Sequence, residues 1–187
     1  MVMAQTVLIT GAGSGFGLAA AKAIAESGHV VYGGIHHQGQ SQALRAASEK
    51  HPIREVILDI TNDASVKDAV QKIISETGTI DCVVHNAGHM CMGSAESFSE
   101  EQFHEYFEIN TVGAHRLNRV VLPVMRRAGR GHVVWVSSSS ARGGSGPLLA
   151  PYFAAKAAMH SLAYSLSTEI AGWGIETTIV VPGQCFS

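Results

Sequence analysis

Charged residues are scarce in this chain of 187 residues. Aspartate, glutamate, lysine and arginine make up 15% of it, and the formal net charge is −2. Proteins that bind nucleic acid usually carry basic runs or a strong positive balance, so we exclude nucleic acid as the main partner. No apolar run approaches the length of a membrane span, and no basic stretch precedes the first apolar segment as it would in a secretory signal. We therefore expect a cytoplasmic protein.

The cysteines and histidines also lack the spacing of a metal-binding site. The three cysteines show no spacing typical of a metal site or a redox pair, and a reduced, intracellular setting fits that usage. They are Cys82, Cys91 and Cys185. The ten histidines are dispersed, and the close pairs at 36–37 and 85/89 have no accompanying acidic or thiol ligands. We predict that the chain has no metal site.

Apolar residues (46%) and glycine (20 residues) are abundant, which indicates one α/β domain over residues 1–187. Six β-rich segments alternate with five helices. We expect a doubly wound, Rossmann-like parallel sheet with right-handed crossovers and strand order 3-2-1-4-5-6. The expected strands are 6–10, 30–35, 56–61, 80–85, 133–136 and 175–181. The expected helices are 16–27, 40–50, 62–77, a long one from Ser99 to near Pro123, and 152–171.

A glycine-rich turn follows the first strand. Glycine allows the backbone to approach a ligand closely, and the start of the following helix offers free N–H groups to a diphosphate. The spacing is Thr-Gly-x-x-x-Gly-x-Gly at Thr10, Gly11, Gly15 and Gly17, whereas G-x-G-x-x-G does not fit from Gly11 because position 16 is phenylalanine. The turn therefore indicates a nucleotide site.

Tyr152 and Lys156 stand four residues apart in the last expected helix. Residues at i and i+4 share a helix face, so the phenol and the ammonium should point into the same space. A nearby cation stabilises a phenolate and lowers the tyrosine pKa. The pair therefore suits general acid–base catalysis.

These motifs, with four others in order, resemble the main single-domain branch of the short-chain dehydrogenase/reductase family along essentially the whole chain. The others are Asn86-Ala87-Gly88, Asn110-x-x-Gly, the run of serines 137–140 and Pro182-Gly183. Relatives usually carry asparagine where this chain has His85. The resemblance implies an NAD(P)-dependent oxidoreductase that transfers a hydride between a nicotinamide cofactor and a carbonyl/secondary alcohol pair.

The resemblance also implies catalytic roles. Tyr152 would exchange the proton with the substrate oxygen, and Lys156 would lower the Tyr152 pKa and bind the nicotinamide ribose. A serine would hydrogen-bond the substrate oxygen. Its position after the apolar run favours Ser138, whereas the usual distance to the tyrosine fits Ser139 as well. Asn110 would hold a water of the proton relay.

Cofactor contacts are implied at a larger set of positions. NADP is favoured and NAD is the alternative, because Ile35 stands in place of a ribose-binding carboxylate and His36 lies where NADP-preferring relatives often carry arginine. The expected cofactor-binding residues are Thr10, Gly11, Ser14, Gly15, Phe16, Gly17, His36, Asp59, Ile60, Asn86, Ala87, Gly88, Tyr152, Lys156, Pro182 and Gly183.

Relatives continue past Pro182-Gly183 through a substrate-covering lid and a further strand. We expect this chain to lack both and to be a catalytically weak fragment, with the last strand an exposed edge; a covering subunit is the alternative. A cofactor-binding regulatory protein, and an isomerase or dehydratase on the same fold, also remain open. Relatives often dimerise through the Tyr152 helix, so we expect a homo-oligomer acting on a small carbonyl or alcohol. Met90, Met92, Leu148 and Leu149 hint at an apolar substrate pocket.

Overall fold

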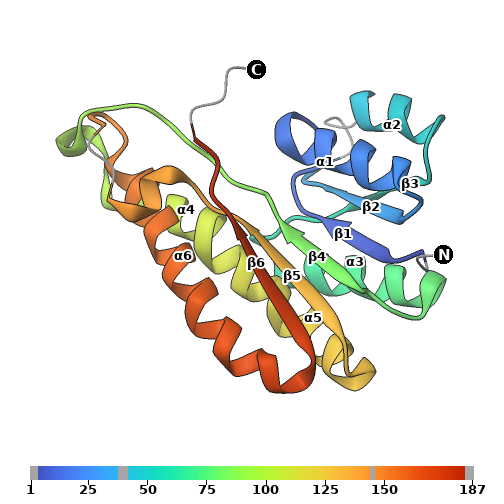
Figure 1. Ribbon diagram of the computed structural model, residues 1–187. Helices are drawn as coiled ribbons and strands as arrows, with labels where there is room; N and C mark the ends of the chain where they lie inside the picture. The colour runs from blue at the N-terminus through green and yellow to red at the C-terminus, as the bar shows by residue number, and fades with distance from the viewer. Residues whose placement is uncertain (1–3, 38–41, 144–145, 184–187) are drawn as a thin grey trace.

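One parallel sheet of six strands organises the molecule, in the order β3-β2-β1-β4-β5-β6 (Figure 1). The computed structural model describes residues 4–37, 42–143 and 146–183. The predicted fold class and strand order are confirmed. The strands are β1 (Thr6–Ile9), β2 (Val30–Ile35), β3 (Ile53–Ile57), β4 (Cys82–His85), β5 (Gly131–Val136) and β6 (Ile175–Val180). The α-helices are α1 (Gly15–Glu26), α2 (Gln42–Ser48), α3 (Asp63–Thr77), α4 (Glu100–Phe107), α5 (Gly113–Ala128) and α6 (Ala150–Ile170).

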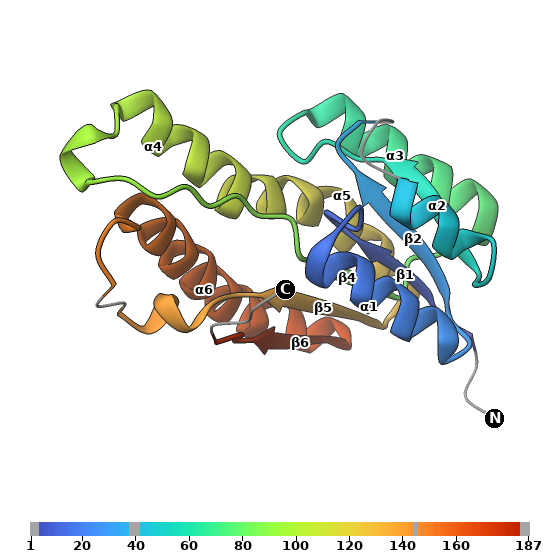
Figure 2. The ribbon, with the colours of Figure 1, turned by 90° about the horizontal axis from the view of Figure 1, so that it is seen from above.

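Helices cover both faces of the sheet, and each face has its own apolar core. One core joins the strands to α3, α5 and α6 through residues such as Val70, Leu117 and Met159. The other joins them to α1 and α2 through residues such as Ala21 and Leu44. Figure 2 shows α1 and α2 gathered at the β1–β2 half of the sheet, away from β6. All six strands end toward one edge, which is where parallel α/β sheets form their ligand sites.

The face of the sheet that packs against α1 and α2 is incompletely covered over β5 and β6. A groove of about 710 Å³ lies there, lined mainly by apolar residues of α1, β4, β5 and β6. Val180 is 44% exposed in it. Within the described part of the chain, β6 pairs with β5 alone.

Several boundaries differ from the sequence-based expectation, and the third strand, which begins at Ile53, differs most. The third strand was expected at 56–61 but ends at Ile57, because only the Leu58 N–H continues the pairing, donating to the Ile35 carbonyl at 2.8 Å. The fifth strand begins two residues early, at Gly131. The second helix ends at Ser48, and its expected first residues, 40–41, lie outside the described residues.

The long helix predicted from Ser99 consists of α4, a π-helical segment (Glu108–Val112) and α5. It begins with a capping box between Ser99 and Gln102. The widened turn has a local cause: the Asn110 side chain donates to the Tyr106 carbonyl at 3.0 Å and so competes for the acceptor that a regular helix would give to a main-chain N–H.

Candidate active site

The turn between β1 and α1 forms one wall of a cleft of about 590 Å³. Gly11 has φ of +65°, and a Cβ there would lie 3.0 Å from the Ala87 Cα. A Cβ at Gly17 would overlap the Gly11 carbonyl oxygen. Glycine is required at both positions because one stretch of backbone lies directly against another.

The start of α1 fits the diphosphate of a dinucleotide. Ser14 is the N-cap residue, but its side chain makes no capping hydrogen bond, and the first turn of α1 has no acidic residue. The first N–H groups of the helix and its positive potential are thus available to an anion. Gly11, Ser14 and Phe16 line the cleft as predicted, whereas Gly15 and Gly17 shape the turn without lining it.

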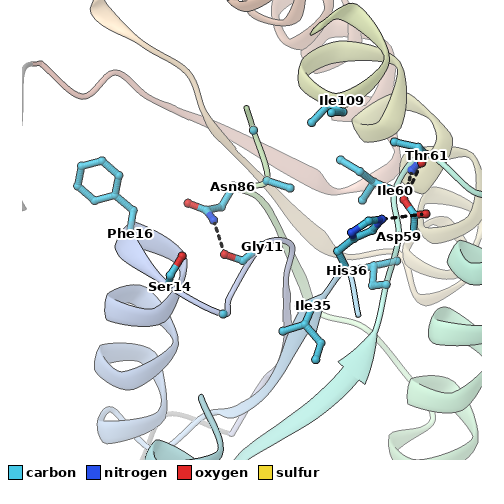
Figure 3. Close-up of a pocket in the computed structure, with 14 residues that line it drawn as sticks. Gly11, Ser14, Phe16, Ile35, His36, Asp59, Ile60, Thr61, Asn86 and Ile109 are labelled. Carbon is cyan, nitrogen blue, oxygen red and sulfur yellow. Dashed lines mark hydrogen bonds and ion pairs between the residues drawn. The ribbon is translucent and has the colours of Figure 1, made fainter. Parts of the chain in front are cut away.

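Thr10 and Asn86 hold the two loops of the cleft together. The Thr10 hydroxyl oxygen accepts hydrogen bonds from the N–H groups of Asn86 (3.0 Å) and Ala87 (2.9 Å). The Asn86 amide donates to the carbonyls of Thr10 (2.9 Å) and Gly11 (3.1 Å), the latter drawn in Figure 3. Thr10 is buried and does not line the cleft, so in this structure it supports the loops rather than facing the cofactor space as predicted.

The far end of the cleft lies beyond β2 and β3. Figure 3 shows His36 and Asp59 facing each other there, with Ser14 and Phe16 at the opposite end. Ile60 also lines this end, as predicted. Ile35 and His36 both line the cleft; the Ile35 side chain is only 1% exposed and packs in the apolar core, whereas the His36 side chain is 61% exposed.

A second pocket of about 220 Å³ adjoins the cleft and shares Phe16, Asn86 and Gly88 with it. The predicted catalytic and nicotinamide-side residues gather here. They are Ser138, Tyr152, Lys156, Pro182 and Gly183. Ser138 lines this pocket, whereas Ser139 is exposed and does not line it, so the geometry favours Ser138.

Tyr152 and Ser138 line the same pocket. Burial raises the Tyr152 pKa above its ordinary value, and the neighbouring Ser138 side chain offsets part of that rise. Lys156 Nζ lies 6.0 Å from the centre of the Tyr152 ring and donates to the Val136 carbonyl at 2.9 Å. Burial is the largest influence on the Tyr152 pKa in this geometry, so the expected lowering by Lys156 stays a prediction. Burial lowers the Lys156 pKa to about 8.

Asn110 is buried next to Lys156 but does not line either pocket. Its side chain donates to the carbonyls of His89 and Tyr106, both at 3.0 Å, and accepts from the His89 N–H at 3.2 Å. A Cβ at Gly88 would lie 2.9 Å from Asn110 Oδ1 and 3.4 Å from Lys156 Nζ. Asn110 thus fixes the loop after β4 in close contact with Lys156.

Comparison with known proteins agrees with this arrangement. The family model described as short chain dehydrogenase matches residues 5–186. The chain belongs to the short-chain dehydrogenase family. Its fold and the resemblance identified from the sequence are thereby confirmed.

Members of this family with assigned names include oxidoreductases of different kinds. The chain is 36% identical over 181 residues to 3-ketodihydrosphingosine reductase of Bacteroides thetaiotaomicron, covering 96% of this chain and 64% of that protein. It is 34% identical to 2,3-dihydro-2,3-dihydroxybenzoate dehydrogenase of Escherichia coli, covering 96% of this chain and 69% of that protein. The chain thus spans about two thirds of the length of these relatives.

Solved structures of family members superpose closely. A short-chain dehydrogenase from Streptomyces avermitilis matches with a TM-score of 0.90 and 33% identity, covering 99% of this chain and 68% of that one. A gluconate 5-dehydrogenase from Burkholderia cenocepacia, solved with NADP and tartrate, matches with a TM-score of 0.89 and 26% identity, covering 98% of this chain and 72% of that one.

Several structural features of this short-chain dehydrogenase were not predicted. The Ser137 hydroxyl contacts His160 Nδ1 at 2.9 Å, directly behind Ser138; His160 follows Lys156 by four residues, so helical spacing could have revealed it. His85 is fully buried and contacts Asn118 Oδ1 at 2.8 Å, and nothing in the sequence links those two positions.

Among the described residues, no three histidine, cysteine, aspartate or glutamate side chains are grouped so that they could hold a metal ion. No described helix is both long and apolar enough to cross a membrane. Cys185 and the other residues of 184–187 lie outside the described residues, as does the segment 144–145 of the loop before α6.

Proposed function

We propose that this chain is an NAD(P)-dependent oxidoreductase that interconverts a carbonyl compound and its secondary alcohol. One observation carries the proposal: the pocket with Ser138, Tyr152 and Lys156 opens beside a cleft whose glycine turn and helix start suit a dinucleotide. A bound nicotinamide would supply or accept the hydride. The NADP in the solved gluconate 5-dehydrogenase supports the same cofactor class.

Tyr152 is the proton donor to the carbonyl oxygen in the reductive direction. Ser138 lines the same pocket and stabilises the substrate oxygen as negative charge develops on it. A raised Tyr152 pKa keeps the phenol protonated at neutral pH, which suits a general acid. In the oxidative direction the same hydroxyl must lose its proton first.

Lys156 binds the cofactor ribose and supplies positive charge near the Tyr152 ring. In the structure its ammonium is held by the Val136 carbonyl. Asn110 holds the neighbouring loop, and its contact with a proton-relay water stays a prediction. Cofactor contacts are assigned to the predicted residues that line the cleft, and Thr10, Gly15 and Gly17 act by shaping its wall.

Met90 lines the pocket, and further apolar side chains lie on the loops beside it. Met90, Met92 and Leu148 are 54%, 68% and 46% exposed, which is unusual for side chains of this size. Leu148 has φ of +70°, a conformation rare for a bulky residue, and its carbonyl accepts from the Gly93 N–H at 2.9 Å. This bond joins the two loops beside the pocket. We infer a carbonyl substrate with an apolar substituent; the relatives' names differ too much to specify it.

The test is transfer of a label from the cofactor. The purified chain is incubated with nicotinamide cofactor carrying deuterium at C4 and a panel of apolar and polar carbonyl compounds. We expect deuterium on the carbinol carbon of the product, with apolar carbonyls preferred. An isomerase or dehydratase would transform its substrate without this label. Tight cofactor binding with no label transfer across the panel would favour the regulatory alternative.

A further inference from the structure

The hydroxyl of Ser138 belongs to a short hydrogen-bonded chain that continues away from the pocket. Its oxygen accepts hydrogen bonds from the Ser140 N–H at 3.2 Å and from the Ser140 hydroxyl at 2.8 Å. Ser140 is 7% exposed, and it does not line the pocket that Ser138 shares with Tyr152 and Lys156. Ser140 would therefore reach a substrate in that pocket through Ser138.

The main chain on both sides of Ser138 is fixed by the segment beside it. The Ser137 N–H donates to the Val180 carbonyl at 2.8 Å, and the Ser139 N–H donates to the Pro182 carbonyl at 2.9 Å. Both neighbours of Ser138 are thus tied to the end of β6 and the residues after it. The freedom left to Ser138 is rotation of its side chain and of its hydroxyl proton. The two hydrogen bonds described above restrict both rotations.

Two donors on one oxygen determine what the Ser138 hydroxyl can still offer. A serine hydroxyl has two acceptor lone pairs and one proton. The N–H and the O–H of Ser140 occupy both lone pairs, so the Ser138 proton remains for a third group. Tyr152 lines the same pocket, and the Ser138 side chain opposes the rise in the Tyr152 pKa. That is the effect expected of a donor near the phenol oxygen.

A carbonyl oxygen bound in this pocket needs such a donor. The oxygen only accepts hydrogen bonds, so Ser138 stabilises it when its hydroxyl proton points at that oxygen. With an unfilled lone pair, the Ser138 oxygen would instead compete for the phenol proton that Tyr152 has to give to the substrate. Hydrogen bonds in a chain also polarise one another, so a donor behind Ser138 strengthens the bond in front of it.

We propose that Ser140 is a positioning residue, which holds the Ser138 oxygen as an acceptor and so directs the Ser138 proton at the substrate oxygen. No proton passes between the two serines. The chain of hydrogen bonds strengthens as negative charge develops on the substrate oxygen during hydride transfer. The proposal rests on the oxidoreductase function proposed above, and it adds to that function a residue that does not touch the substrate.

The experiment is a double-mutant cycle on Ser138 and Ser140. Values of kcat and KM are measured for the wild type, Ser138→Ala, Ser140→Ala and the double variant, with the carbonyl compound that the labelling experiment selects. Ser140→Thr keeps a hydroxyl at this position and tests rescue. Ser139→Ala is the matched control, because it removes an exposed hydroxyl from the same turn. Circular dichroism and the dissociation constant of the cofactor establish that each variant is folded with its cleft intact.

We expect Ser140→Ala to lower kcat by about tenfold and to change KM by less than about threefold, because the lost hydrogen bond acts on charge that develops in the transition state. Ser140→Thr should restore kcat to within about threefold of the wild type. In the Ser138→Ala background, removal of the Ser140 hydroxyl should change kcat by less than about twofold, because no hydroxyl is left for it to orient. Ser139→Ala should match the wild type.

Four results would overturn the inference and leave the proposed function intact. One is kcat of Ser140→Ala within about twofold of the wild type, and another is an unchanged kcat in Ser138→Ala. The third is an equal loss from Ser140→Ala in both backgrounds, since Ser140 would then act on the loop rather than through Ser138. The fourth is a folded Ser140→Thr as slow as Ser140→Ala. A wild type that transfers no label to any carbonyl compound would overturn the proposed function, and the inference with it.

Discussion

Replacing Lys156 by methionine should stabilise the fold while it removes the catalytic cation. Lys156 is 4% exposed, and burial lowers its pKa to about 8, from 10.5 for an ordinary lysine. That difference corresponds to about 3 kcal/mol of unfolding free energy lost at neutral pH. Methionine leaves the Val136 carbonyl without its donor, at a cost of about 1 kcal/mol. The expected net gain is about 2 kcal/mol, or roughly 6 °C in the unfolding temperature.

The pH dependence gives the sign of the effect. The unfolded chain retains the lysine proton to a higher pH, so it binds more protons than the folded chain between about pH 8 and 10.5. Wild-type stability therefore rises with pH across this window, and the advantage of Lys156→Met should nearly vanish by about pH 9.5. Urea denaturation followed by circular dichroism at pH 7.0 and 9.5 measures the unfolding free energy of the wild type and of Lys156→Met. Lys67→Met, on the exposed face of α3, is the control and should change neither the unfolding free energy nor its pH dependence.

A loss of more than about 1 kcal/mol at pH 7.0 in Lys156→Met would refute the reasoning, because the ammonium would then be a stabilising group. An advantage of equal size at both pH values would show that packing, rather than charge, produces it.

Three further predictions concern other parts of the structure. Burial lowers the His85 pKa to about 4, so the unfolded chain binds more protons than the folded chain between pH 6.5 and 4. The unfolding free energy should therefore fall by about 3 kcal/mol as the pH drops through this window. In His85→Gln this part of the pH dependence should be missing from the urea midpoints. Ser138→Ala should lower turnover by about 10²-fold or more, whereas Ser139→Ala should keep it within about threefold; equal losses would reject the assignment. Gly17→Ala should cost about 1–3 kcal/mol in urea denaturation, since its methyl group meets the Gly11 carbonyl, and an unchanged midpoint would show that the turn can relax.

The strand order could be predicted because six β-rich segments alternate with helices, which restricts the topology to a doubly wound sheet. The helix expected at 62–77 was also predictable: Asn62 accepts hydrogen bonds from the N–H groups of Ala64 and Ser65 at the start of α3, and asparagine is a preferred N-cap residue. The end of the third strand was not, because Leu58 and Ile60 remain buried after the strand pairing has stopped. The apolar pattern of a sequence indicates which residues are buried, and here the buried residues continue past the last hydrogen bond of the strand pairing.

Side-chain electrostatics were the least predictable part of the site. Helical spacing correctly placed Tyr152 and Lys156 at one pocket, but it could not give their burial, which dominates both pKa values. Likewise, the sequence placed His36 and Asp59 near a cofactor without indicating their contact, because they lie on different strand ends 23 positions apart in the chain. Such contacts depend on loop conformation after β2 and β3, which a residue pattern does not specify.

The most direct test of the proposed mechanism compares Tyr152→Phe with the wild type. Turnover is measured with an apolar carbonyl substrate selected by the labelling experiment, and the affinity for the cofactor is measured separately. The phenol is the proton donor in our account, while cofactor affinity comes from the cleft and Lys156. We predict that turnover falls by about 10²- to 10⁴-fold and that the dissociation constant of the cofactor changes by less than about threefold. Turnover of Tyr152→Phe within about threefold of the wild type would contradict the role of Tyr152 as the acid and base.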